Sequence, residues 1–322
     1  MNEITFDIKQ EVLLAARRIH SYIRETPLEY SFHLSQLSGS KVFLKLENLQ
    51  LTGSFKLRGA TNKLLSLSSE QREKGVVAAS TGNHGAAVAF GMSKLAIPGI
   101  IFVPENASTS KLESIRRLGA EIRVHGDDSA ITELFARRYA EENSLTYISP
   151  YNDPAIIAGQ GTIAEEISRQ IDHLDAIFVS LGGGGMISGI AGYLKSIDAS
   201  VRVIGCSPEN SPVMIESIKA NRIIEMESQP TLSDGTAGGI EPHTITFELC
   251  RRLVDEYVEV SEEEIKAAML LFIEKHHQMI EGAGGVAIAA LLKRQEFLRG
   301  KNIVIVICGG NLSLKTLRAI LC

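Results

Sequence analysis

The feature that most constrains this chain is a regular alternation of short apolar, β-branched runs with longer amphipathic stretches. The short runs predict strands at Lys41–Glu47, Val76–Ser80, Gly99–Val103, Glu121–Val124, Thr146–Ser149, Ala176–Ser180, Val201–Cys206 and Asn302–Cys308. The longer stretches predict helices at Gly82–Lys94, Ser108–Leu118, Ser129–Glu142, Pro154–Arg169 and Ser261–His277. Such alternation indicates an α/β fold with parallel sheets. The runs AIFVSL and IVIVIC are apolar throughout, as is typical of strands covered on both faces.

The length of 322 residues suits two domains or one large α/β unit. We find no internal repeat and no Pro/Ser-rich linker between the predicted elements. We therefore expect interleaved domains: a large one from residues 1–74 and 152–322, and a small inserted α/β domain from residues 75–151.

Composition argues against several classes of partner. The formal net charge is −5, the basic residues are scattered and Trp is absent, which disfavours nucleic acid and anionic membranes. The four cysteines form no CxxC pair, so a zinc site or disulfide framework is not expected and a reducing compartment is. The first residues do not resemble a signal peptide, and no run is long and apolar enough to span a bilayer. We expect a cytoplasmic protein.

The first motif that suggests chemistry is Ser54-Phe55-Lys56-Leu57-Arg58-Gly59-Ala60. A lysine at the start of a helix lies near the positive end of the helix dipole, which lowers its pKa. Since the neutral amine is the form that attacks an aldehyde, Lys56 suits imine chemistry. For an isolated lysine, the alternative is a solvated surface residue.

Two further motifs follow predicted strands and open helices. The backbone N–H groups of Ser80-Thr81-Gly82-Asn83-His84-Gly85 could bind a carboxylate, although a capped turn with a structural His84 is the alternative. In Leu181-Gly182-Gly183-Gly184-Gly185-Met186, four consecutive glycines let several N–H groups converge on one phosphate. No Lys-Ser/Thr pair follows, and Ser188 stands where a dinucleotide fingerprint needs glycine. A ligand with a single phosphate is therefore predicted.

The fourth motif, Cys308-Gly309-Gly310-Asn311, ends the last apolar run. Ligands gather at the carboxyl ends of parallel strands. By itself, however, this motif favours a simple strand-to-helix turn with a buried cysteine.

Together the motifs resemble the pyridoxal 5'-phosphate (PLP)-dependent serine/threonine dehydratase and serine racemase family, which has a tryptophan-synthase-β-like fold. SFKLRGA, STGNHG, the four glycines, PAIIAGQGT, SDGT and CGGN follow that family's order and spacing, from about Ile8 to Leu317. The resemblance implies two open, twisted, mostly parallel sheets covered by helices, with PLP bound by the large domain. Segments such as SPENSPVM are most similar to bacterial threonine dehydratase-like proteins, some linked to hydroxyectoine utilisation.

The resemblance also implies roles for individual residues. Lys56 corresponds to the Schiff-base lysine, which then removes the Cα proton of the substrate. Thr81 is a second catalytic candidate, because serine racemases have an acid–base Ser there and threonine dehydratases usually have Ala. The implied cofactor-binding residues are Phe55, Lys56, Asn83, Gly182, Gly183, Gly184, Gly185, Met186, Gly235, Glu281 and Cys308. The implied substrate-binding residues are Ser80, Thr81, Asn83 and His84.

Two positions depart from common patterns of the family. Cys308 stands where most relatives have Ser facing the pyridine nitrogen, and neither group can hold that nitrogen protonated as an aspartate would. A weaker electron sink favours prompt loss of a β-substituent. Residues 207–213 lack two of the acids that form a divalent-cation site in some relatives, so we predict no metal ion there.

The implied activity is dehydration of a β-hydroxy amino acid such as L-threonine or L-serine to a 2-oxo acid and ammonia. Three alternatives stay open. Thr81 could support an amino-acid racemase, the substrate could be a larger β-hydroxy amino acid from hydroxyectoine breakdown, and the glycine loop alone could belong to a non-enzymatic nucleotide-binding module. The expected partners are a small amino-acid substrate and a second copy of the chain in a homodimer.

Overall fold

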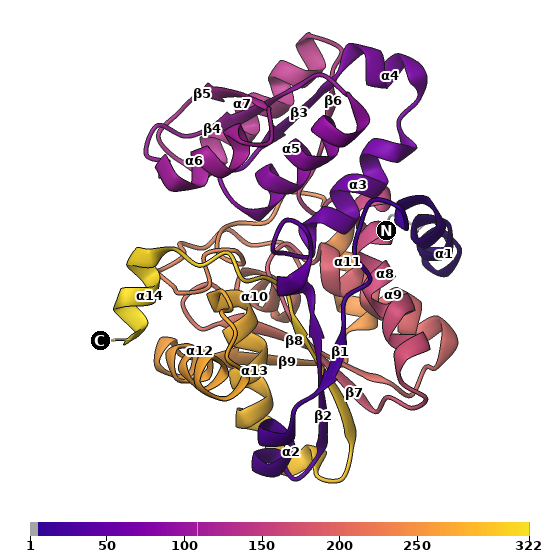
Figure 1. The fold of residues 1–322 in the computed structure, drawn as a ribbon, viewed down its shortest axis with the longest axis vertical. Helices are drawn as coiled ribbons and strands as arrows, with labels where there is room; N and C mark the ends of the chain where they lie inside the picture. The colour runs from indigo at the N-terminus through magenta and orange to yellow at the C-terminus, as the bar shows by residue number, and fades with distance from the viewer. Residues whose placement is uncertain (1–5, 108, 322) are drawn as a thin grey trace.

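The computed structural model describes residues 6–107 and 109–321, and it has two sheets. The larger sheet has the strand order β1-β2-β10-β7-β8-β9 and is parallel except for β1 against β2. The smaller sheet, β5-β4-β3-β6, is parallel throughout. In Figure 1 the smaller sheet lies above the larger one, with α3 between them. The predicted fold class is confirmed.

The strands are β1 Leu28–Tyr30, β2 Lys41–Leu46, β3 Val76–Ala79, β4 Gly99–Val103, β5 Glu121–Val124, β6 Thr146–Tyr147, β7 Ala176–Ser180, β8 Arg202–Pro208, β9 Glu256–Val260 and β10 Asn302–Ile307. The helices up to the glycine loop are α1 Ile8–Ile19, α2 Phe32–Ser38, η1 Glu47–Leu49, α3 Lys56–Ser66, α4 Ser69–Lys74, α5 Asn83–Leu95, α6 Thr109–Arg116, α7 Ser129–Glu142 and α8 Pro154–Gln170. The later ones are α9 Gly185–Ile197, α10 Val213–Lys219, α11 Ile245–Leu253, α12 Glu262–His276, α13 Gly282–Arg294, η2 Gln295–Leu298 and α14 Leu314–Leu321.

The central strand β10 shows why the larger sheet is covered on both faces. Side chains alternate between the two faces of a strand. Val304 and Val306 enter the core formed with α1, α8 and α9, whereas Ile303, Ile305 and Ile307 enter the core formed with α12 and α13. A strand in this position has to be apolar at every residue, which explains the run IVIVI.

The predicted strands and helices agree well with the structure. The bounds of β4, β5, β7 and α7 match the prediction at both ends. Ser261 is the N-cap of α12 and forms a capping box with Glu264. The predicted start of α6 at Ser108 lies outside the described residues. The strands β1 and β9 and several helices were not predicted.

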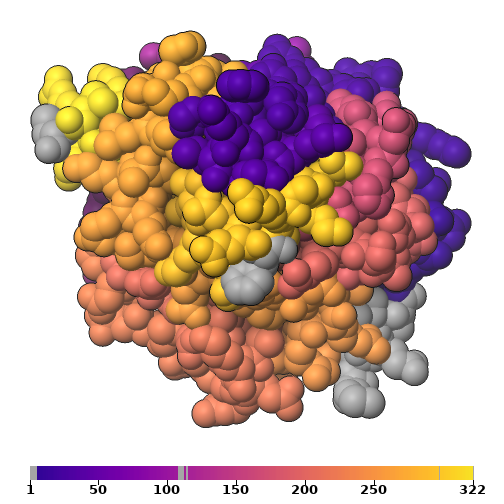
Figure 2. Space-filling view, turned by 90° about the horizontal axis from the view of Figure 1, so that it is seen from below, coloured from indigo at the N-terminus to yellow at the C-terminus, as the bar shows by residue number. Residues whose placement is uncertain are grey.

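The N-terminal and C-terminal parts of the chain meet where strands β2 and β10 begin, side by side in the larger sheet. The turn after α2 contacts the turn before β10: the Ser40 hydroxyl donates to the Leu298 carbonyl at 2.6 Å, and Gly300 N–H donates to the Gly39 carbonyl at 2.8 Å. Figure 2 shows this face, with the indigo N-terminal segment beside the yellow C-terminal one. Strand β10 is thereby placed next to β2, although more than 250 residues separate them.

A buried ionic cluster joins α3 to the larger sheet and to α8. Arg58 is fully buried and contacts two carboxylates, with its Nε 2.8 Å from Glu47 and its Nη1 2.6 Å from Glu166. Lys45, also fully buried, pairs with Glu166 and donates to the Thr26 carbonyl at 2.8 Å. Two cations and two carboxylates therefore balance one another out of contact with water. Since Lys56 is two residues before Arg58, the cluster also anchors the first turn of α3.

We expect Glu166→Gln to lower the free energy of unfolding by about 3–5 kcal/mol, because it leaves buried cations without a counter-charge. The matched control is the adjacent Glu165→Gln. The Glu165 carboxylate lies 2.9 Å from Nε of Arg169, whose side chain is half exposed. Such a surface pair contributes about 0–1 kcal/mol. Urea denaturation of both variants is the measurement, and equal losses would contradict the assignment.

Candidate active site

The start of α3 is attached to the end of β10. Ser54 forms an isolated antiparallel bridge with Gly309, and Phe55 N–H donates to the Cys308 carbonyl at 3.0 Å. One residue further out, Gly310 N–H donates to the Gly53 carbonyl at 2.9 Å. The first and fourth sequence motifs are therefore one piece of structure, at the carboxyl end of a central parallel strand. This is where open α/β sheets bind ligands.

Lys56 is the first residue of α3, and its side chain is turned inward. The amine donates to the Pro150 carbonyl at 2.8 Å and lies 5.3 Å from the centre of the Phe55 ring. Burial lowers the pKa of Lys56 from 10.5 to about 8, although the nearby Glu281 and Glu133 carboxylates act in the opposite direction. A substantial fraction of this amine is thus neutral near pH 8. Neutrality is what a nucleophilic or basic lysine needs.

The glycine loop, residues 182–185, contacts the backbone segment that also holds the Lys56 amine. Tyr151, the residue after Pro150, packs on the loop so closely that a Cβ on Gly183 would lie 2.5 Å from its ring and one on Gly185 2.9 Å from its Cα. A Cβ on Gly182 would likewise lie 2.9 Å from the Thr236 backbone. Gly184 has φ +83°, a conformation that favours glycine. The four glycines are therefore required by close packing and backbone conformation, and they open α9.

Asn83 begins α5 and belongs to a polar network that crosses between the two sheets. Its amide nitrogen donates to both carboxylate oxygens of Glu281, each at 2.9 Å. Its amide oxygen accepts from Asn311 at 2.7 Å. The same Glu281 carboxylate is 3.9 Å from the Cys308 sulfur. The structure thus brings Asn83, Glu281 and Cys308 together, three residues that are far apart in the sequence.

The thiol of Cys308 is neutral. Burial, together with the Glu281 carboxylate, raises its pKa well above 9. A neutral thiol is a weak hydrogen-bond donor and a weak acceptor, and it adds no charge to the site.

The His84 side chain points into the protein interior. Its ring is 4% exposed, and Nε2 donates to the Ile148 carbonyl at 2.8 Å. Burial and the nearby charge of Lys56 lower the pKa of His84 to about 3, so the ring is uncharged. What His84 can offer an anion at this helix start is its backbone N–H. Ser80, Thr81 and Gly82 are partly exposed in the same turn, and the Ser80 hydroxyl accepts from Gly82 N–H at 3.1 Å.

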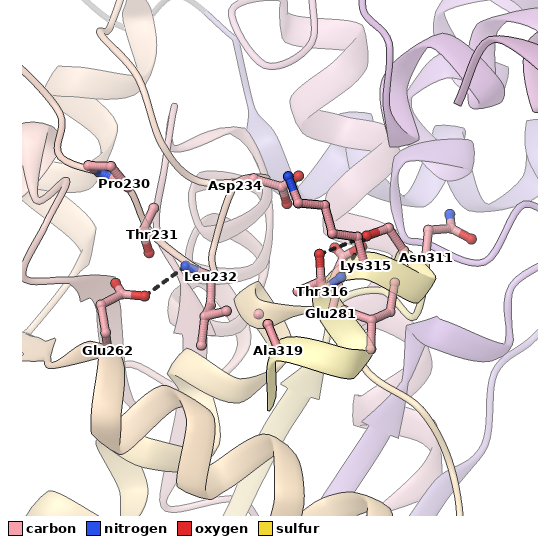
Figure 3. Close-up of a pocket in the computed structure, with 13 residues that line it drawn as sticks. Pro230, Thr231, Leu232, Asp234, Glu262, Glu281, Asn311, Lys315, Thr316 and Ala319 are labelled. Atoms are coloured by element: carbon pink, nitrogen blue, oxygen red, sulfur yellow. Dashed lines mark hydrogen bonds between the residues drawn. The ribbon is translucent and has the colours of Figure 1, made fainter. Parts of the chain in front are cut away.

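A pocket of about 450 Å³ adjoins this network on the side of α14. Glu281 and Asn311 belong to both the pocket and the Asn83 network. Figure 3 shows Pro230, Thr231 and Leu232 lining it opposite α14, which contributes Lys315, Thr316 and Ala319. A volume of this size admits a small molecule.

The residues present fit PLP. A partly neutral lysine amine can take up its aldehyde, glycine N–H groups at the start of α9 can bind its phosphate, and uncharged Cys308 suits an unprotonated ring nitrogen. Among the described residues, no group of three or more His, Cys, Asp or Glu side chains is arranged to hold a metal ion.

Sequence reasoning missed several residues that shape this site. Pro150 accepts the Lys56 bond, Tyr151 supports the glycine loop, and Asn311 fixes the Asn83 amide. Asn311 lies within the motif CGGN and so could have been found there. Pro150 and Tyr151 act through a backbone carbonyl and a ring face, for which the sequence carries no recognisable pattern.

Comparison with known proteins identifies the family. Residues 19–309 match the family model of pyridoxal-phosphate dependent enzymes, and the chain belongs to that family. It is 42% identical over 315 residues to an L-threonine ammonia-lyase of Thermotoga maritima, covering 98% of this chain and 77% of that one. It is 41% identical over 304 residues to a catabolic L-threonine dehydratase of Staphylococcus aureus, covering 93% and 88%. The predicted cofactor, PLP, is thereby confirmed.

Solved structures agree with this assignment. Maize serine racemase superimposes with a TM-score of 0.91 at 33% identity, over 97% of this chain and 96% of that chain. The processed form of threonine deaminase isoform 2 from Solanum lycopersicum gives 0.92 at 32% identity, over 97% and 92%. None of the described helices is long and apolar enough to cross a membrane.

We expect Lys56 of the cofactor-free protein to react with acetic anhydride half-maximally near pH 8, because burial disfavours its charged form and only the neutral amine reacts. An ordinary lysine reaches that point near pH 10.5. Competitive labelling followed by peptide mass spectrometry measures Lys56 and the exposed lysines in one sample. A Lys56 curve that coincides with theirs would show that its amine is not desolvated.

Proposed function

We propose that this enzyme dehydrates a β-hydroxy amino acid, such as L-threonine or L-serine, to a 2-oxo acid and ammonia. The observation that carries the proposal is the partly neutral Lys56 amine, separated from the glycine loop only by Pro150 and Tyr151. The names of the two bacterial relatives support the same reaction class.

When bound, PLP supplies an aldehyde that attaches amines reversibly and a ring that withdraws electrons from the substrate Cα. The chain's own residues then divide the remaining work. Backbone N–H groups of residues 182–186 would hold the phosphate, while Phe55, Gly235 and Glu281 would line the ring. Asn83, held by Glu281 and Asn311, would bind the ring hydroxyl. Neutral Cys308 would leave the ring nitrogen unprotonated.

The substrate carboxylate binds at the start of α5, through backbone N–H groups and the hydroxyls of Ser80 and Thr81. Lys56 Nζ in its neutral form removes the Cα proton. The β-hydroxyl then leaves as water, and hydrolysis gives the 2-oxo acid and ammonia. The Lys56 amine donates a hydrogen bond to the Pro150 carbonyl at 2.8 Å, and this bond holds the base in place.

The racemase alternative rests on Thr81 and on the similarity to maize serine racemase. A hydroxyl at Thr81 could return a proton to the Cα face opposite Lys56. A dehydratase of a larger β-hydroxy amino acid is a further alternative within the main reaction class. One substrate panel, scored for 2-oxo acid and for the D-enantiomer, separates all three.

We also propose three organisational features. Residues 75–151 form a small domain inserted in a larger one made of residues 1–74 and 152–322; the smaller sheet takes all its strands from within that span. The protein acts in the cytoplasm. It forms a homodimer, for which the exposed apolar residues Tyr30 and Phe32 of the β1–α2 region offer a surface. Light scattering of the purified protein tests the last of these.

We expect Lys56→Ala to reduce 2-oxo acid release from L-threonine and L-serine by at least about 100-fold, because it removes both the attachment point and the base. Borohydride reduction followed by peptide mapping should place the cofactor on Lys56 in the wild type. Lys74→Ala on α4, which removes a surface lysine that pairs with Glu70 at 2.9 Å, is the control and should keep its activity. Full turnover in Lys56→Ala would end the proposal.

A further inference from the structure

The segment that crosses from the small domain to the large one, residues 149–153, contacts several parts of the proposed site. Pro150 holds the Lys56 amine, and Tyr151 packs on Gly183 and Gly185. Asp153 caps α8 by accepting from Ala155 N–H at 2.8 Å. Asn152, between Tyr151 and Asp153, contacts Glu241, which forms an ion pair with Arg137.

Asn152 ties together two segments that flank the glycine loop. Its amide nitrogen donates to Glu241 at 2.8 Å, and its amide oxygen accepts from Ile245 N–H at 3.1 Å. Directly after Ile245, the Thr246 hydroxyl donates to the Gly183 carbonyl at 2.7 Å. The glycine loop is therefore supported by α11 and by Tyr151, and Asn152 sets the distance between these two supports.

Glu241 receives a second bond from the same crossover segment. Its backbone N–H donates to the Tyr151 hydroxyl at 2.7 Å. Glu241 belongs to the stretch of residues 232–244, which contains no helix or strand and whose Thr236 packs on Gly182. This stretch, called here the covering loop, thus contacts the glycine loop directly at one point and through Tyr151 at another.

Arg137, on α7 of the small domain, is the cation that faces Glu241. Its guanidinium bonds the Glu241 carboxylate and also Glu133 at 2.9 Å, and it lies 4.3 Å from the centre of the Tyr147 ring. The side chains of Arg137 and Glu241 are 29% and 19% exposed, so this pair is only partly screened by water. The planar guanidinium is held on three sides, which gives the contact a defined geometry.

We propose that Arg137 and Glu241 are positioning residues for the cofactor phosphate. Their ion pair fastens the covering loop to the small domain, and through Tyr151 and Asn152 it keeps the glycine N–H groups in the arrangement that binds phosphate. A preformed set of donors binds an anion more tightly than one that has to be ordered on binding. Retention of PLP therefore depends on Arg137 of the small domain, although Arg137 itself contacts none of the four glycines.

The proposal rests on the proposed cofactor site and is tested by PLP affinity as well as turnover. Apoenzyme is titrated with PLP for Arg137→Met, Glu241→Gln and the double variant, and kcat is measured at saturating PLP. Each single variant should weaken PLP binding by about tenfold, the size expected for one hydrogen bond to a charged group. At saturating PLP, kcat should stay within about twofold of the wild type, because bound phosphate orders the glycine loop and, with it, the crossover segment that holds Lys56.

The double variant separates a joint role from two independent ones. If the two side chains act through each other, it should bind PLP no more weakly than either single variant. The matched control is Arg202→Met, which breaks a comparable part-exposed pair with Glu256 at 2.7 Å on β8 and β9 and should leave PLP affinity unchanged. Urea unfolding of all four apoproteins shows whether a change in affinity merely follows a loss of stability.

Three results would overturn the proposal: wild-type PLP affinity in the single variants, losses that multiply in the double variant, or an equal loss in Arg202→Met. These results are distinguishable from failure of the proposed function. If the wild type binds PLP on Lys56 while Glu241→Gln binds PLP with wild-type affinity, only the role proposed for this ion pair is wrong. If borohydride fixes no cofactor on wild-type Lys56, the site itself is wrong.

Discussion

The site depends on the short backbone pairing between residues 53–55 and 308–310, which fastens the start of α3 to the end of β10. Lys56 follows directly, so its position is set by a central strand of the larger sheet and not by a flexible loop. The buried Arg58 cluster adds a second anchor two residues after Lys56, within the same first turn of α3. A reactive amine that is held at both ends of its turn can be kept partly desolvated, and that is the cause of its lowered pKa. The chemistry proposed for Lys56 therefore follows from how α3 is attached.

Two groups near the Lys56 amine carry no charge, namely the Cys308 thiol and the His84 ring. The Glu281 carboxylate beside the thiol accepts from the Asn83 amide nitrogen through both of its oxygens. The neutral His84 ring and the neutral thiol have the same main cause, which is burial. If Cys308 faces the cofactor ring as proposed, its neutral thiol would leave the ring nitrogen unprotonated, and the ring would withdraw electrons only moderately. This environment fits elimination of a β-substituent better than chemistry that needs a long-lived carbanion.

Features that depend on neighbouring residues could be predicted from the sequence, whereas contacts between distant segments could not. The strands AIFVS and IVIVI were predicted because a strand covered on both faces must be apolar at each residue, and the glycine loop because four consecutive glycines leave several backbone N–H groups unobstructed. Strand β9, EYVEV, was missed because an outer strand keeps charged residues and has no such constraint. The fold class and cofactor were confirmed, whereas the roles of individual site residues stay predictions. Contacts made by a carbonyl, such as that of Pro150, leave no pattern in the sequence and needed the three-dimensional arrangement.

The crossover at residues 149–153 explains why the two sheets need to stay in contact for the site to exist. Within five residues, the chain supplies an acceptor for Lys56, a ring that packs on the glycine loop, an amide that bonds both Glu241 and Ile245, and a cap for α8. No single one of these contacts is strong, since each is an ordinary hydrogen bond or packing contact. Because they lie on consecutive residues, however, a shift of the segment alters all of them at once. Movement of the smaller sheet relative to the larger one would therefore change the Lys56 amine and the glycine loop together, which links the proposed base to the proposed phosphate site.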